Sequence, residues 1–302
     1  MKILKKIGKI LATILASLLA LVVLVLGGLN IAKFFIYDDY YDAETTLCRN
    51  PGLNDGFVCQ GIAAADGENL ILVSGYMADK SPSRIYVTTL DSKSYYVTLH
   101  CDGEPYTGHA GGIAVSGDMA YIANGSKIFS FPLRDVLGAK NGDSVNIGEG
   151  VKINNKASFL YTDDTYLYVG SFMDDSTKRV EEHIFETAEG THYAICSVYA
   201  IGDLSAPVRI YSIRDCVQGI CFTPDGKVVM STSYGLSSSG YYVYDLAHAT
   251  DSGKVLDGAP VYYLDKPEEK TDGPAMAEGL DFYKGKIITL TESASNKYIF
   301  GK

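Results

Sequence analysis

The chain has 302 residues, of which 26 are Lys or Arg and 36 are Asp or Glu, so its formal net charge is −10. This acidic balance argues against a nucleic-acid-binding protein, which needs a basic surface to replace the counterions of the phosphate backbone. A hydrophobic content of 47% excludes a disordered chain, and six cysteines are too few for a disulfide scaffold of this length.

The first 33 residues carry only positive charge, in the form of five lysines. No charged residue lies between Lys9 and Lys33, and the 23 residues of this stretch, 10–32, are mainly Leu, Val, Ile and Ala. At about 1.5 Å per residue a helix of this length spans roughly 34 Å, which is enough to cross the hydrocarbon core of a bilayer. The sequence therefore predicts a transmembrane helix over 10–32.

The charges on the two sides of this stretch differ in sign. Four lysines precede it, whereas three Asp and one Glu follow it within residues 38–44. The positive-inside rule places the basic tail 1–9 in the cytoplasm and the chain beyond a juxtamembrane linker, 33–44, outside the cell membrane. A cleaved signal peptide is the alternative, but the apolar stretch is long for one and its end forms a poor cleavage site. The main domain is exported in either case, so disulfides are allowed, although six cysteines permit many pairings.

Residues 45–302 show short β-branched and aromatic segments separated by Gly, Asp, Asn and Ser, with no sustained helical period. A small residue within an apolar segment recurs five times, each time followed by a tight turn and a second strand. These residues lie 51, 46, 61 and 60 positions apart and are Gly61, Gly112, Ser158, Gly219 and Gly279. Four-stranded units of about 50 residues are typical of propeller blades, so the sequence predicts an all-β, five-bladed β-propeller.

We expect fourth strands at 95–99, 144–153, 208–213 and 261–264, and the fifth blade lacks one. The segment 43–48 upstream of the first blade is predicted to supply it, which closes the ring and removes its open edges. The third blade is longer than the others, and its extra residues, 173–191, are predicted to form a charged surface loop. A six-bladed ring and a β-sandwich are the alternatives, but the unit occurs in only five copies.

Several segments of the exported part carry a family resemblance. They include Gly-Phe-Val-x-Gln-Gly-Ile at 56–62, Tyr-Thr-Gly-His-Ala-Gly-Gly-Ile-Ala at 106–114, Val-Gln-Gly-Ile at 217–220 and the C-terminal segment 292–302. In these the chain resembles a group of membrane-anchored extracellular propellers of Gram-positive bacteria, with a Pro-Asp-Gly-Lys turn at 224–227 that resembles YVTN and NHL repeats. This resemblance implies an architecture and a location, and no activity. The Gln-Gly-Ile and Glu-Gly-Leu strands also resemble five-bladed glutaminyl cyclotransferases, whose pocket Trp residues are absent from this chain.

The first strand of each propeller blade lines a central channel, so the residues before the recurring small positions face a common axis. Three of these residues are polar, namely Gln60, Gln218 and Glu278. Neighbouring segments at the same end of the channel add Tyr76, His109, Asn124, Tyr234 and Glu292. We expect these eight residues to form a ligand-binding site at one channel mouth, the alternative being a channel that is polar only because it holds water.

Within this set Glu278 and Glu292 are the only carboxylates and His109 is the only imidazole, so these three are the candidates for acid–base catalysis. The sequence has no Gly-x-Ser-x-Gly elbow, and we expect neither a metal nor a cofactor. It favours a module that binds a small polar ligand or a cell-surface protein, with an extracellular enzyme of cyclotransferase or hydrolase type as the alternative. Two carboxylates without a basic residue favour a neutral or cationic ligand over an anion.

Overall fold

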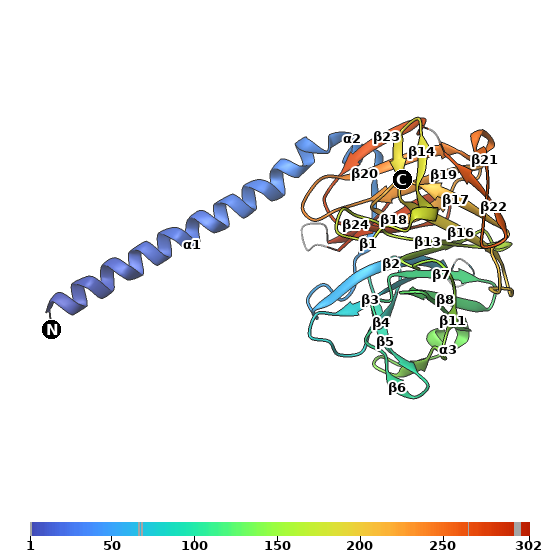
Figure 1. Cartoon of the computed structure of the whole chain (residues 1–302). Coiled ribbons are helices and arrows are strands. Elements are labelled where there is room, and N and C mark those ends of the chain that lie inside the picture. The colour runs from blue at the N-terminus through green and yellow to red at the C-terminus, as the bar shows by residue number, and fades with distance from the viewer. Residues whose placement is uncertain (1, 66, 68, 265, 293–296) are drawn as a thin grey trace. The chain divides into compact units, whose positions relative to one another are not determined.

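The computed structural model of the chain describes residues 2–65, 67, 69–264, 266–292 and 297–302 (Figure 1). The chain divides into two compact units, one of residues 1–43 and the other of residues 44–302. The first unit is helical, whereas the second consists mainly of β-sheet.

The first unit contains two helices, α1 (Lys2–Ile36) and α2 (Asp38–Ala43). The 35 residues of α1 correspond to about 52 Å of helix at 1.5 Å per residue. Its segment Lys5–Ile36 has a mean hydropathy of 2.9 and is long and apolar enough to cross a membrane, a property that N-terminal signal sequences share. The helix continues beyond both ends of the apolar stretch 10–32, because Lys is a good helix former and neither Gly nor Pro follows within 33–36.

The second unit is a ring of five sheets, or blades, as the repeat predicts. The innermost strands are β2 (Phe57–Ala65), β7 (Gly112–Ser116), β12 (Phe159–Thr162), β18 (Val217–Phe222) and β24 (Ala277–Tyr283). The second strands are β3 (Leu70–Met77), β8 (Met119–Asn124), β13 (Tyr166–Gly170), β19 (Lys227–Thr232) and β25 (Lys286–Thr291). The third strands are β4 (Arg84–Thr88), β9 (Lys127–Pro132), β16 (Ala194–Ala200), β20 (Ser239–Asp245) and β26 (Tyr298–Gly301).

The outer edges of the blades are less regular. The fourth strands are β5 (Ser94–Cys101), β11 (Val151–Lys152), β17 (Arg209–Ile213), β23 (Glu269–Gly273) and β1 (Thr45–Arg49). Additional elements are β6 (Glu104–Pro105), β10 (Ser144–Asn146), β14 (Phe185–Thr187), β15 (Gly190–His192), β21 (Thr250–Leu256), β22 (Ala259–Tyr263), α3 (Leu133–Leu137), η2 (Glu181–His183) and η3 (Leu246–His248).

The ring is closed by the strand that comes first in the chain. β1 pairs antiparallel with β26, with Thr45 opposite Gly301 and Thr46 opposite Phe300. This pairing confirms the predicted closure, since β1 covers the outer edge of the last blade.

The core of the ring lies between neighbouring blades. One apolar cluster joins Ile288 and Ile299 of the fifth blade to Cys59 and Ile71 of the first blade, and it includes Cys48 of the closing strand. Similar clusters join the first blade to the second and the second to the third. Blades packed on both faces explain why the strands are apolar along most of their length. All six cysteines lie in the described part of the chain and are free thiols.

The recurring small residues let the inner strands approach one another closely. A Cβ atom built on Gly61 would lie 2.7 Å from the backbone nitrogen of Ile113, and one on Gly219 would lie 2.6 Å from that of Leu280. Real Cβ atoms do not come this close to backbone, so glycine is required at both positions. The repeat seen in the sequence is therefore a packing requirement of the ring.

The predicted fourth strand 144–153 of the second blade is wrong, because the structure divides it between two blades. β10 pairs in parallel with β5 of the first blade, and only the short β11 pairs with β9 of the second. Gly148 and Gly150, both with positive φ, lie between the two strands and allow the chain to change direction.

The predicted fourth strand 261–264 of the fourth blade is also wrong. It overlaps β22, which pairs in parallel with β17 of the third blade, Val261 lying opposite Ile210. The fourth strand of the fourth blade is instead β23, with the sequence Glu-Lys-Thr-Asp-Gly. Its side chains are largely exposed, and backbone pairing with β20 holds it in place, so it shows no apolar alternation.

The insertion 173–191 is more ordered than the predicted surface loop, because it contains η2 and most of the β14–β15 hairpin. His192, at the end of that hairpin, is buried, and its Nε2 lies 3.4 Å from Oε2 of Glu189. The carboxylate of Glu189 also accepts hydrogen bonds from Arg214 and, at 2.8 Å, from the hydroxyl of Tyr244. These contacts fasten the insertion to the third and fourth blades.

Candidate functional site

A pocket of about 410 Å³ lies where the inner strands of the ring begin. All five blades contribute to its wall, which consists of Gln60, His109, Gly111, Asn124, Gly125, Ala157, Ser158, Phe172, Gln218, Glu278 and Glu292. Because every blade supplies a part of the wall, the pocket surrounds the axis of the ring.

Six of the eight residues predicted for a ligand site lie in this wall, namely Gln60, His109, Asn124, Gln218, Glu278 and Glu292. Tyr76 packs against His109, with the two ring centroids 4.4 Å apart, but is not itself part of the wall. Tyr234, which follows β19, is 55% exposed and lies outside the wall.

The third blade supplies three wall residues that the predicted set lacks, Ala157, Ser158 and Phe172. The hydroxyl oxygen of Ser158 accepts a hydrogen bond of 3.1 Å from the backbone nitrogen of Phe172. The repeat contained a signal for these two residues, because Ser158 occupies the recurring small position and Phe172 follows a second strand. Neither side chain is titratable, so neither is a candidate for acid–base catalysis.

Two amide side chains present unused acceptors in this pocket. Nε2 of Gln60 donates to the carbonyl oxygen of Cys59 at 3.0 Å, and Nε2 of Gln218 donates to the hydroxyl of Ser233 at 3.3 Å. Neither side-chain carbonyl oxygen accepts a hydrogen bond from a described residue, although Gln60 is only 8% exposed. Both oxygens are therefore free to accept a hydrogen bond from a ligand or from water.

The most unusual feature of the wall is a pair of carboxyl groups. Glu278 is 3% exposed and is hydrogen-bonded to Glu292. Burial raises the pKa of Glu278 well above its usual value, and the charge of Glu292 and the hydrogen bond between the two groups raise it further. The raised pKa favours the protonated form of Glu278 beside Glu292.

The backbone at both carboxyl residues is fixed by hydrogen bonds. The hydroxyl of Ser231 donates to the carbonyl oxygen of Glu278 at 2.7 Å. The backbone nitrogen of Glu292 donates to the carbonyl oxygen of Met276 at 2.9 Å. These bonds fix the backbone from which both side chains extend. The fourth and fifth blades together therefore hold the two carboxyl groups in place.

The other titratable groups around the pair are neutral at pH 7. Burial lowers the pKa of His109, and the nearby charge of Glu292 only partly opposes this effect. Burial raises the pKa of Cys59 to about 12, and burial followed by the charges of Glu292 and Glu278 raises the pKa of Tyr76. Among the described residues no Lys or Arg lines the pocket, so its charge is negative.

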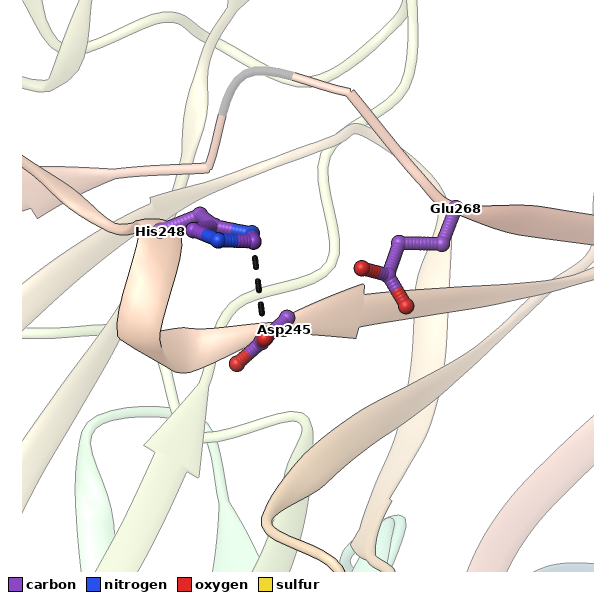
Figure 2. Close-up of side chains that lie close together, drawn as sticks. All are labelled: Asp245, His248 and Glu268. Carbon is purple, nitrogen blue, oxygen red and sulfur yellow. Dashed lines mark ion pairs between the residues drawn. The ribbon is translucent and has the colours of Figure 1, made fainter.

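Outside the pocket, one group of side chains in the described part of the chain has the spacing of metal ligands. It consists of Asp245, His248 and Glu268 (Figure 2), with His248 Nδ1 3.7 Å from Asp245 Oδ2. Asp245 also accepts a hydrogen bond of 2.8 Å from the backbone nitrogen of Ala247 and caps η3, while Glu268 pairs with Lys227 at 2.9 Å. Each carboxylate has a protein partner and the side chain of His248 is 77% exposed, so we assign the group a structural role.

A larger cavity, of about 1310 Å³, opens where the inner strands end. The carboxylate of Asp281 in its wall accepts hydrogen bonds from the backbone nitrogens of Ala64, at 2.6 Å, and Phe282, at 2.8 Å. Its aromatic rings pack on one another, the centroids of Tyr161 and Phe222 being 5.2 Å apart. These side chains are occupied in holding neighbouring blades together.

No protein-family model matches the chain, and no curated protein matches its sequence. Solved structures match at low similarity. The PQQ-bound aldose sugar dehydrogenase from Streptomyces coelicolor is 14% identical with a TM-score of 0.46, and the match covers 82% of this chain and 76% of that one. The WD40 β-propeller domain of Doa1 is 9% identical with a TM-score of 0.42, and the match covers 85% of this chain and 97% of that one. The function is therefore argued from the pocket.

Proposed function

We propose that the protein is a membrane-tethered extracellular propeller that binds a small polar ligand in the pocket at the ring axis. The observation that carries the proposal is the convergence of Gln60, Gln218 and Glu278, one repeat position in three blades, on a single cavity together with Glu292. A cavity that merely holds water does not require a buried carboxyl group with a raised pKa.

The location is part of the same proposal. Residues 10–32 within α1 serve as an uncleaved anchor, the tail 1–9 is cytoplasmic, 33–44 is the juxtamembrane segment and 45–302 is the extracellular propeller. The support is the length and hydropathy of α1 together with the lysines before it and the acidic residues after it.

The pocket is tested by a binding assay that also identifies the ligand. The full chain in detergent is equilibrated with a pool of small polar metabolites, and the retained compounds are identified by mass spectrometry. We expect at least one compound to be retained by the wild type and by Lys284→Ala, whose exposed turn lies at the other end of β24, and to be lost in Gln60→Ala and Gln218→Ala. The same retained compounds for all four proteins would contradict the proposal.

An enzyme acting at the same pocket is the second candidate, and the hydrogen-bonded carboxyl pair favours it. A protonated Glu278 next to an ionised Glu292 supplies a general acid and a general base within one site. His109 makes no side-chain hydrogen bond with either carboxyl group among the described contacts, so it is a weaker candidate for catalysis. Conversion of a compound in the pool by the wild type, lost in Glu278→Gln, would establish this reading.

A further inference from the structure

We propose that the ligand of this pocket carries one cationic nitrogen and that its binding expels the proton shared by Glu278 and Glu292. The inference rests on the proposed function, because it concerns the same pocket, and it specifies the chemical class of the ligand and a proton released on binding.

The carboxyl groups of Glu278 and Glu292 are hydrogen-bonded to each other. Carboxylates are acceptors only, so this bond requires one of the two groups to carry a proton. Glu278 is almost fully buried, whereas Glu292 is partly exposed, so the proton is best placed on Glu278 and the charge on Glu292. Before a ligand binds, the two carboxyl groups together thus carry a single negative charge.

No other charged group among the described residues balances this charge. Cys59 on β2 and Tyr76 on β3 have raised pKa values, and His109, in the segment before β7, has a lowered pKa, so all three are neutral at pH 7. Gln60 and Gln218, which complete the surroundings of Glu278, do not titrate. A ligand cation is therefore the missing partner of Glu292.

The shape and polarity of the pocket fit an organic cation with N–H donors. The free carbonyl oxygens of Gln60 and Gln218 accept such hydrogen bonds, and the aromatic ring of Phe172 in the wall provides a surface that attracts a cation. A positive charge beside the pair also favours the ionised form of Glu278, so the shared proton leaves as the ligand enters. An anion meets repulsion, and a neutral ligand leaves the proton in place.

The unequal burial of the two carboxyl groups predicts different effects of two isosteric variants. In Glu292→Gln the remaining acid, Glu278, is buried and uncharged, so the pocket loses its negative charge and we expect at least about a tenfold loss of cation affinity. In Glu278→Gln the charge of Glu292 remains, so a cation still binds, but no proton is left to release. Glu149→Gln on the exposed surface serves as the control for both.

The experiment uses a fragment set of matched triads that differ only in charge, such as trans-4-aminocyclohexanol, cyclohexane-1,4-diol and 4-hydroxycyclohexanecarboxylate. Binding to the full chain in detergent is measured by ligand-observed NMR, and thermal unfolding of each variant confirms its fold. Proton release is measured by calorimetry in two buffers of different ionisation enthalpy. We expect the amines to bind at least about tenfold more tightly than the alcohols, with a proton released by the wild type and none by Glu278→Gln.

The alternative outcomes separate the two proposals. Alcohols or carboxylates that bind as well as the amines, are lost in Gln60→Ala and are retained in Glu292→Gln would overturn the charge inference and leave the binding function intact. Equal proton release by the wild type and Glu278→Gln would overturn the shared proton. Signals that no pocket variant changes would overturn the binding function, and the inference with it.

Discussion

Gly279 of the last blade and Ile62 of the first lie so close that a Cβ atom on Gly279 would be 2.9 Å from the backbone nitrogen of Ile62. Both residues belong to innermost strands, β24 and β2, which contact each other where the ring closes. The neighbouring atoms are backbone, which cannot move aside as a flexible side chain can. The closure of the ring therefore depends on the absence of a side chain at position 279.

Gly279→Ala is expected to destabilise the propeller by about 1 to 3 kcal/mol, the usual cost of forcing an extra methyl group into close-packed structure. Gly67→Ala is the matched control, because a Cβ there has no neighbour within 4 Å. Thermal unfolding followed by circular dichroism measures both variants. Indistinguishable transitions would show that the inner strands separate easily, contrary to the packing described above.

Deletion of residues 45–49 is expected to lower the melting temperature by at least about 5 °C, since it uncovers the edge of β26 and removes Cys48 from the core. Deletion of residues 34–38, which is equally long and contains no buried residue, is the control. Calorimetry measures the melting temperatures of the two deletion variants and of the wild type. Equal melting temperatures would mean that the β1–β26 pairing contributes little to stability.

The proposed anchor predicts how the protein partitions in cells. The full-length chain is expected to stay with the membrane fraction after high-salt washing, because apolar burial of α1 does not depend on ionic strength. Protease added outside should digest residues beyond about 40 while sparing the tail. A mature form released into the medium without its first 30 or so residues would identify α1 as a cleaved signal sequence instead.

The raised pKa of Glu278 predicts how stability depends on pH. In the unfolded chain this carboxyl group has its normal pKa, so above that value the folded state binds more protons than the unfolded state. Stability arising from Glu278 is thus fully present below the normal pKa of Glu and is lost as the pH rises through the raised value. Glu278→Gln should remove this decline and be more stable than the wild type at alkaline pH.

Urea unfolding at a series of pH values measures this effect, with Glu149→Gln, an exposed carboxylate, as the control. If the wild type and Glu278→Gln show parallel pH profiles, the carboxyl group of Glu278 is not buried in its neutral form.

The third and fourth blades show which strands a sequence pattern can predict and which it cannot. The alternation and turns that mark β12, β13 and β16 lie within short stretches of chain, so each strand is visible in its own residues. The edge strand β23 of the next blade is polar and exposed, and its pairing uses backbone groups that every residue has. Such strands leave no apolar pattern, so the sequence alone predicts the wrong blade for 261–264.

The sequence by itself determined the apolar N-terminal helix, the five repeated units, the closing strand and the polar residues that face the axis, because each follows from local composition or spacing. Only the tertiary structure decided that Glu278 is buried beside Glu292 and has a raised pKa, since both depend on how the blades pack around it. It also added Ser158 and Phe172 to the wall and left Tyr234 outside it. Burial and contact across the ring are collective properties of five blades, and no single segment encodes them.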